Sequence, residues 1–164
     1  MDVRSGHLAP SRTAAEGARL GQWLAVLVPA GLLAGALGSQ HLGGLHPCEM
    51  CYWQRYPHWA AIALGILSFM VPAARRPLIL LAALAIAVSG AIGVLHAGVE
   101  LGWWEGLTTC TSTGAATLED ILAAPVVRCD QVQFSFLGVS MAGWNAAISL
   151  VAAGTIAWLT LRRA

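Results

Sequence analysis

The stretch PLILLAALAIAVSGAIGVLHAGV, residues 77–99, contains no Asp, Glu, Lys or Arg. A helix needs about 20 predominantly apolar residues to cross the hydrocarbon core of a bilayer. Residues 22–42 and 137–161 also meet this length. Residues 56–72 form a shorter apolar stretch, which reaches it only by including residues before Tyr56. We therefore predict an all-α integral membrane protein with a bundle of four transmembrane helices.

The composition agrees with this class. The chain is 57% hydrophobic and 10% charged and has no lysine, whereas about 25% of the residues of a soluble domain are charged. No basic stripe with interleaved aromatic residues is present, so nucleic acid is excluded as a partner. The length of 164 residues fits one domain, residues 1–164.

The segment before the first span is small and polar. We expect residues 1–20 to be a disordered cytoplasmic tail. A cleaved signal peptide is the alternative for residues 22–42, but this apolar stretch is longer than the 7–15 residues of a signal-peptide core.

The arginines are distributed unevenly between the two sides that four spans create. Cytoplasmic loops carry an excess of Lys and Arg. Seven of the nine arginines fall on one side: Arg4, Arg12, Arg19, Arg75, Arg76, Arg162 and Arg163. That side is predicted to be cytoplasmic, so both termini are cytoplasmic and residues 43–55 and 100–136 form two outward-facing loops.

All four cysteines fall in these two loops. Cys48 and Cys51 lie in the first loop, and Cys110 and Cys129 lie in the second. Disulfides form and persist on the oxidising side of a membrane. Four cysteines allow three pairings, of which one pair in each loop is the simplest.

The second loop carries further structural signals. The sequence TLEDILAA, residues 117–124, begins like a capping box and predicts a short helix on the membrane surface. Four aromatic residues flank this loop and fit an interfacial belt: Trp103, Trp104, Phe134 and Phe136. In the first span, Gly31 and Gly35 predict a close contact between helices.

The spacing of Cys48, Cys51 and Arg55 indicates thiol chemistry. Two cysteines three residues apart lie on one face of the first turn of a helix, where the helix dipole stabilises a thiolate. Arg55 follows one turn later, where its charge lowers a thiol pKa and its N–H groups can bind a carbonyl oxygen. Three alternatives remain: a zinc site that includes His46, a purely structural pair of disulfides, and an Arg55 side chain that snorkels to lipid phosphates.

Three segments carry a resemblance to a known family. They are PCEMCYWQRYP (47–57), HAGVELGWWEGLTTC (96–110) and CDQVQFSFLGVSMAGWN (129–145). Together and in this order they resemble the disulfide bond formation protein B (DsbB) family. The resemblance implies a protein of the bacterial inner membrane that reoxidises DsbA, a periplasmic thioredoxin-fold oxidase. It also implies that the electrons pass to the membrane quinone pool, with ubiquinone or menaquinone as cofactor and no metal.

The resemblance also implies a role for each cysteine. Cys110 would form the mixed disulfide with DsbA, and Cys129 would be its partner. Cys129 would then attack Cys48, which leaves Cys51 as the thiolate that faces the quinone beside Arg55. The spacing from Cys110 to Cys129 is short for the family.

Five other polar residues lie in or near the expected spans. His96 and Glu100, one helical turn apart, are candidates for the quinone site, with ordinary helix-end positions as the alternative. His46 and His58 flank the Cys-x-x-Cys motif and are expected to be solvated interface residues, with a proton relay as the alternative. Asn145 is expected to form a hydrogen bond between helices.

Two other functions fit parts of the pattern. Vitamin K epoxide reductase-like enzymes share the chemistry, but they place a Cys-x-x-Cys near the last helix, where residues 140–163 contain no cysteine. A non-catalytic four-span scaffold with two structural disulfides is the alternative from another class. Mild thiols separate it from an enzyme, because structural bridges resist exchange.

Overall fold

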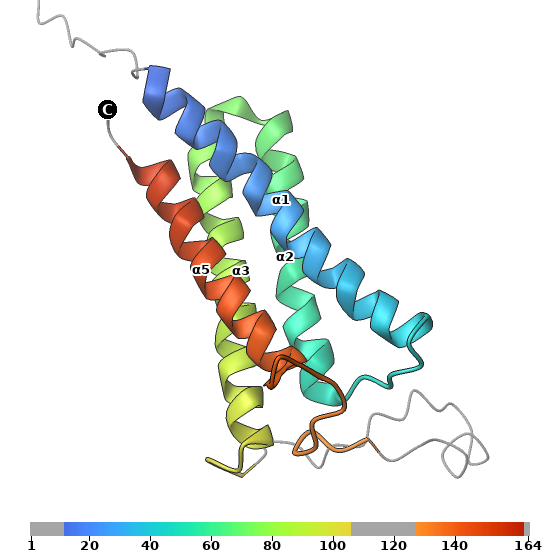
Figure 1. The fold of residues 1–164 in the computed structure, drawn as a ribbon. Helices are drawn as coiled ribbons and strands as arrows, with labels where there is room; N and C mark the ends of the chain where they lie inside the picture. Colours follow the sequence, from blue (N-terminus) through green and yellow to red (C-terminus); the bar gives the residue numbers. More distant parts are fainter. Residues whose placement is uncertain (1–11, 106–126, 163–164) are drawn as a thin grey trace, which may run out of the picture.

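The computed structural model describes residues 12–105 and 127–162. Within these ranges the chain forms four long helices: α1 (Arg12–His41), α2 (Glu49–Met70), α3 (Arg75–Glu100) and α5 (Met141–Leu161). They lie side by side in one bundle (Figure 1). The prediction of a mostly helical architecture is therefore confirmed for the described part of the chain.

The four helices pack in a closed order. α3 packs against α2 and α5, and α1 packs against the same two helices from the other side. The short 3-10 helix η1 (Pro72–Ala74) joins α2 to α3. The start of α1, η1 and the end of α5 lie at one end of the bundle, and the connections that bear Cys48 and Cys129 lie at the other (Figure 1).

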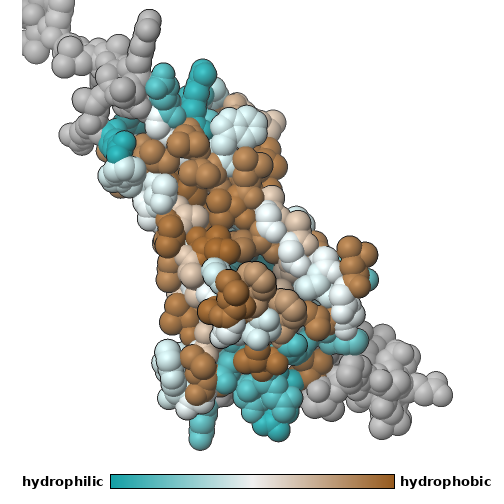
Figure 2. All heavy atoms as spheres, viewed as in Figure 1, coloured by the Kyte–Doolittle hydropathy of each residue, from teal (hydrophilic) through white to brown (hydrophobic). Residues whose placement is uncertain are grey.

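Three segments are long and apolar enough to cross a membrane: Glu16–His41, Pro72–Glu100 and Met141–Leu161. α2 has 22 residues but is not among them, because polar side chains occupy its first half. Hydrophobic residues cover the middle of the bundle, while hydrophilic residues gather at its two ends (Figure 2). The chain is thus a multi-pass membrane protein, and a span formed by α2 stays a prediction.

Small side chains allow the helices to approach closely. The largest core cluster consists mainly of alanines, with three isoleucines: Ala25, Ala61, Ile79, Ala82, Ala83, Ile86, Ala153 and Ile156. A Cβ atom added at Gly65 would lie 2.6 Å from Val26 Cγ2, and one added at Gly93 would lie 3.0 Å from Ala142 O. These glycines set the contacts of α2 with α1 and of α3 with α5.

The start of α1 corrects the expected tail. The helix begins at Arg12, so the expectation that residues 1–20 are disordered is wrong for residues 12–20. Alanine-rich sequence favours a helix there. The segment also packs on α5, because a Cβ atom added at Gly17 would lie 3.2 Å from Leu159 O.

The other boundaries shift by a few residues. α2 begins at Glu49, inside the expected loop 43–55. α5 begins at Met141, after a small hairpin of β1 (Ser135–Phe136) and β2 (Val139–Ser140). The two turn residues between these strands, at positions 137 and 138, have φ values of 53° and 79°, and positive φ at both positions characterises a tight hairpin turn.

The remaining predictions for the second loop have different outcomes. Trp103, Trp104, Phe134 and Phe136 are exposed, as an interfacial position requires. The short helix expected at 117–124 lies outside the described residues.

Candidate functional site

Cys48 and Cys51 lie at the start of α2, as their spacing predicts. Cys48 is the N-cap residue, and its Sγ accepts a hydrogen bond from the Cys51 backbone N–H at 3.3 Å. The two Sγ atoms are 2.9 Å apart. Both sulfurs therefore lie where the unpaired backbone N–H groups of the first turn favour negative charge.

A third cysteine reaches this pair from the second loop. Cys129 is fully buried, and its Sγ, Cys48 Sγ and His96 Nε2 all lie within 4.8 Å of one another. Met50 and Val99 belong to the same apolar cluster. The structure thus brings together one cysteine from each predicted loop, while Cys110 lies outside the described residues.

The two thiols of the pair differ in acidity. The hydrogen bond from Cys48 lowers the pKa of the Cys51 thiol, and the Cys48 backbone and the charge of Arg55 act in the same direction against burial. The same hydrogen bond, burial and nearby negative charge raise the pKa of the Cys48 thiol. Both cysteines lie before residue 56, where the second span is expected to begin, so neither thiol lies within the predicted membrane-spanning segment. Cys51 is therefore the thiol that ionises first.

Arg55 is held by the end of α1. Its Nη1 donates to Gln40 Oε1 at 2.6 Å, and its Nη2 donates to Ala36 O at 3.2 Å. The guanidinium also lies over the Tyr52 ring, 5.2 Å from the centroid. These contacts oppose the alternative in which Arg55 snorkels to lipid phosphates, because its N–H groups are directed to α1.

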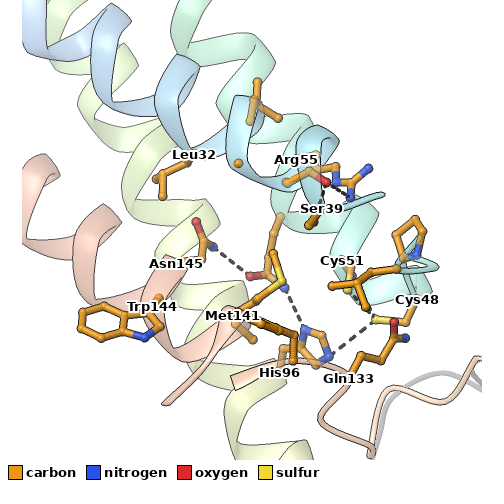
Figure 3. Close-up of a pocket in the computed structure, with 18 of the residues that line it drawn as sticks. Leu32, Ser39, Cys48, Cys51, Arg55, His96, Gln133, Met141, Trp144 and Asn145 are labelled. Carbon is orange, nitrogen blue, oxygen red and sulfur yellow. Dashed lines mark hydrogen bonds between the residues drawn. The ribbon is translucent and has the colours of Figure 1, made fainter. Parts of the chain in front are cut away.

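A cavity of about 260 Å³ lies between these elements. Cys48, Cys51, Arg55, His96 and Glu100 all line it, and Figure 3 shows the two cysteines, Arg55 and His96 around it. Small-molecule sites usually have about 300–1,000 Å³, so this cavity is near the lower end of that range. Of the predicted site residues that the structure describes, all except Cys129 line it.

The cavity exists partly because of two glycines on α1. Gly31 and Gly35 line it, and a Cβ atom added at either glycine would have no heavy atom within 4 Å. The prediction that they make a close contact between helices is therefore wrong. Their missing side chains leave space beside Arg55.

A group of polar residues connects α2, α3 and α5 closer to the middle of the bundle than the sulfurs of Cys48 and Cys51. His58 is only 3% exposed, and its Nε2 lies 2.9 Å from Asn145 Oδ1 and 2.9 Å from Ser89 Oγ. The interpretation of His58 as a solvated interface residue is therefore wrong. Asn145 Nδ2 donates to Gln54 Oε1 at 2.8 Å, which confirms the predicted hydrogen bond between helices.

Sequence reasoning missed Gln54 and Ser89. Both are buried, and Gln54 Nε2 lies 2.8 Å from His96 Nδ1. A signal was present, because Gln54 and His58 are four residues apart and so share a helix face. Polar residues on one face of an apolar helix point to the interior of a bundle.

Glu100 occupies the rim of the cavity. Its side chain is 7% exposed, and its Oε1 lies 3.8 Å from His96 Nε2. Its Oε2 is buried and has no hydrogen-bond partner among the described residues. This placement favours a site residue over an ordinary helix-end position. In contrast, His46 lines the cavity but is exposed, as expected.

Comparisons with known proteins identify the family of the chain. The family model of the disulfide bond formation protein DsbB matches residues 18–159. Curated relatives named "Disulfide bond formation protein B" include one from Marinobacter nauticus, 32% identical over 75% of this chain and 80% of the relative. One from Aromatoleum aromaticum is also 32% identical, over 83% of this chain and 89% of the relative. No solved structure matches the chain significantly. Because the family match covers the helices and all the described cysteines, the chain belongs to the DsbB family of membrane proteins, which act in disulfide bond formation.

Proposed function

We propose that the chain is a quinone-dependent thiol oxidase that reoxidises a periplasmic DsbA-like thioredoxin-fold protein and thereby generates disulfides de novo. The position of Cys51 carries this proposal. Its thiol lines a cavity together with Arg55, and its neighbour Cys48 lies beside the loop that bears Cys129. Both cysteines line the cavity, and Cys48 in addition lies close to Cys129, which supports exchange with a small molecule through Cys51 and with the second loop through Cys48.

The residues of the cavity fit a quinone ring. Gly31 and Gly35 leave a space that a side chain would fill, and Leu32 and Leu33 add apolar surface. The N–H groups of Arg55 can donate to a carbonyl oxygen. When bound, ubiquinone or menaquinone would accept two electrons and two protons.

The cysteines of the chain can carry out the thiol–disulfide exchange that precedes quinone reduction. The Cys129 thiolate would attack Cys48 of a Cys48–Cys51 disulfide. The Cys48–Cys129 bond then forms, and Cys51 leaves as a thiolate with the electron pair. Because the pKa of Cys51 is lowered, Cys51 is the better leaving group. The positive charge of Arg55 stabilises it there, and Cys110 would receive the electrons from the DsbA-like partner.

The proposed location is the bacterial inner membrane, with both termini in the cytoplasm. Arg19 lies in the first part of α1, Arg75 and Arg76 begin α3, and Arg162 follows α5. The start of α1, the start of α3 and the end of α5 lie at the same end of the bundle (Figure 1). By the positive-inside rule this end is cytoplasmic. The cysteines at the opposite end then face the periplasm, where a DsbA-like protein would meet them.

Quinone reduction by the purified protein tests the proposal. A reduced DsbA-type oxidase is the donor, and short-chain ubiquinone and menaquinone analogues are the acceptors. We expect Cys51→Ser to abolish turnover. We expect Arg55→Ala to raise KM for quinone about 10- to 100-fold, the size of a lost hydrogen bond from a charged donor. Arg76→Ala, at the other end of the bundle, is the matched control and should behave like the wild type.

The opposite result is equally clear. If the wild type reduces neither analogue and its disulfides survive the reduced donor, the enzymatic proposal is wrong. The chain is then better described as a scaffold with structural disulfides.

A further inference from the structure

The hydrogen bonds among the polar residues between α2, α3 and α5 have defined donors and acceptors. Gln54 Nε2 lies 3.1 Å from Met50 O, and Asn145 Nδ2 lies 3.2 Å from Ser89 O. A backbone carbonyl can only accept hydrogen bonds, so each contact requires an amide nitrogen at that position. The 2.8 Å contact between Gln54 Oε1 and Asn145 Nδ2 then joins an acceptor to a donor. Reversing either amide would place like groups against each other.

This assignment of donors and acceptors determines the tautomer of His96. The second N–H of Gln54 Nε2 points to His96 Nδ1 at 2.8 Å, so Nδ1 must present a lone pair. A neutral imidazole carries its single proton on the other nitrogen. His96 therefore has its proton on Nε2, which lies 3.5 Å from Cys48 Sγ and 3.8 Å from Glu100 Oε1. Both neighbours can accept a hydrogen bond, and His96 also forms a hydrogen bond with the Cys129 backbone, so the N–H lies between the two cysteines.

We propose that Gln54 is a positioning residue: by donating to His96 Nδ1, it holds the ring in the tautomer that presents an N–H to the Cys48 sulfur. Figure 3 shows this chain of contacts from Asn145 through Gln54 and His96 to Cys48. The inference rests on the proposed function in one respect, namely that Cys48 reacts. An N–H donor favours a thiolate over a thiol, so it offsets part of the burial that opposes ionisation of Cys48.

The same tautomer of His96 argues against a metal bound between Cys48, His96 and Cys129. Cys48, His96 and Cys129 place three potential ligand atoms within 4.8 Å of one another. A histidine that binds a metal through one nitrogen usually donates from the other to an acceptor. Here Nδ1 receives a hydrogen bond, and Nε2 carries the proton. The arrangement therefore gives the Cys48 sulfur an N–H donor and leaves Nε2 without a lone pair for a cation.

Nitrogen-15 NMR of histidine-labelled full-length protein in detergent tests the tautomer directly. For the wild type we expect a pyridine-type shift at Nδ1 of His96 and a pyrrole-type shift at Nε2. Gln54→Met has a similar length but no N–H, and it should release the ring from this single pattern. Gln54→Glu offers only oxygen atoms and should place a proton on Nδ1. Ser149→Ala removes another buried member of the group, which donates to Asn145 at 3.1 Å, and should leave the pattern unchanged.

The effect on Cys48 is measured in a chain that keeps Cys48 alone, with Cys51, Cys110 and Cys129 replaced by alanine. The other titratable groups that line the cavity are then Arg55 and His58 of α2, His96 and Glu100 of α3, and His46 and Arg128 of the two loops, and all of them are unchanged between the variants compared. In this background we expect Gln54→Met to reduce the acid ionisation constant of the Cys48 thiol about two- to twelve-fold, the effect of one ordinary hydrogen bond. Ser149→Ala should leave it unchanged.

Two results would overturn the inference. One is a pyrrole-type Nδ1 in the wild type, and the other is an unchanged shift pattern in both Gln54 variants that fold with wild-type melting temperature. Neither result depends on quinone turnover. A wild type that reduces no quinone but shows the expected pattern would reject the proposed function and leave the positioning role of Gln54 intact.

Discussion

At the scale of single residues, Cys48 and Cys51 have opposite surroundings although their sulfurs are 2.9 Å apart. Cys51 receives a hydrogen bond from Cys48 and lies near the charge of Arg55, whereas Cys48 is buried beside Cys129. A thiol pair of this kind releases one particular sulfur as thiolate when its disulfide opens. In the proposed exchange, this asymmetry would give the electrons a direction, from the second loop to the cavity.

The lowered pKa of Cys51 predicts the pH dependence of its reactivity. An ordinary cysteine has a pKa of about 8.5 and loses thiolate as the pH falls through that value. Because the Cys51 pKa is lower, its thiolate persists further into neutral pH and disappears only below the lowered pKa. We expect iodoacetamide to alkylate Cys51 of the reduced chain with a midpoint below pH 8.5, measured by tandem mass spectrometry.

Variants of Arg55 and Arg76 separate the effect of the Arg55 charge from the other causes of the lowered Cys51 pKa. Arg55→Ala should move the midpoint of Cys51 alkylation to higher pH, because a stabilising charge is lost. Arg76→Ala should not move it. A wild-type midpoint at or above pH 8.5 would contradict the acidity assigned to Cys51.

At the scale of helices, glycines have two different functions. Gly31 and Gly35 on α1 border the cavity with open space at the Cβ position, whereas Gly65 on α2 faces Val26 of α1 at a Cβ distance of 2.6 Å. The sequence does not distinguish them, because each is a glycine within an apolar helix. Only the rotation of α1 about its axis decides which face meets a neighbour.

This difference predicts two contrasting substitutions. Gly31→Leu should fold normally, since glycine is about 0.8–1.0 kcal/mol less favourable in a helix than alanine, leucine ranks close to alanine, and a Cβ atom at this position has no heavy atom within 4 Å. It should also raise KM for quinone at least tenfold by filling the cavity. Gly65→Leu should instead lower the melting temperature, because α1 cannot move away without loss of packing. Steady-state kinetics and thermal unfolding in detergent measure both effects, and equal KM values for Gly31→Leu and the wild type would reject this cavity as the quinone site.

The hydrogen bonds of Asn145 predict its contribution to stability. It bonds Gln54, Ser89 and His58 at 2.8–3.2 Å and so ties α5 to α2 and α3. Asn145→Leu would leave these groups without their partner. We expect a loss of about 1–3 kcal/mol, since a buried group without a partner costs about that much. Thr155→Val, on an exposed part of α5, is the control and should change the unfolding midpoint little in a denaturant titration. A similar loss in both variants would contradict this contribution.

The sequence predicts individual helices better than it predicts their contacts. Apolar length places α1, α3 and α5, and the i, i+3 and i+4 spacing places Cys48, Cys51 and Arg55 near each other, because both properties are local. The burial of His58 and the role of Gln54 depend on the register between helices. One sequence contains no direct record of that register, so the polar group became visible only in the structure.

At the scale of the whole molecule, the site requires one end of each of the four helices to lie at the same end of the bundle. The end of α1, the start of α2, the end of α3 and the start of α5 all border the cavity. This arrangement requires α2 to return the chain to the opposite end, where η1 and Arg76 lie (Figure 1). We therefore predict that α2 is a span in a bilayer even though its first half is polar. The polar side chains Gln54 and His58 are tolerated because they bond within the bundle and do not face lipid.

Labelling from one side of the membrane tests this topology. In a chain with all four native cysteines replaced by alanine, single cysteines are introduced at Leu42 and Arg76. Both positions are exposed, and they lie before and after α2. We expect a membrane-impermeant maleimide to label Leu42→Cys in intact spheroplasts, whereas Arg76→Cys should react only after permeabilisation. If both positions react from the same side, α2 does not cross the membrane and the four-span arrangement is wrong. If the two positions exchange their behaviour, α2 crosses but the cysteines face the cytoplasm, and a periplasmic partner is excluded.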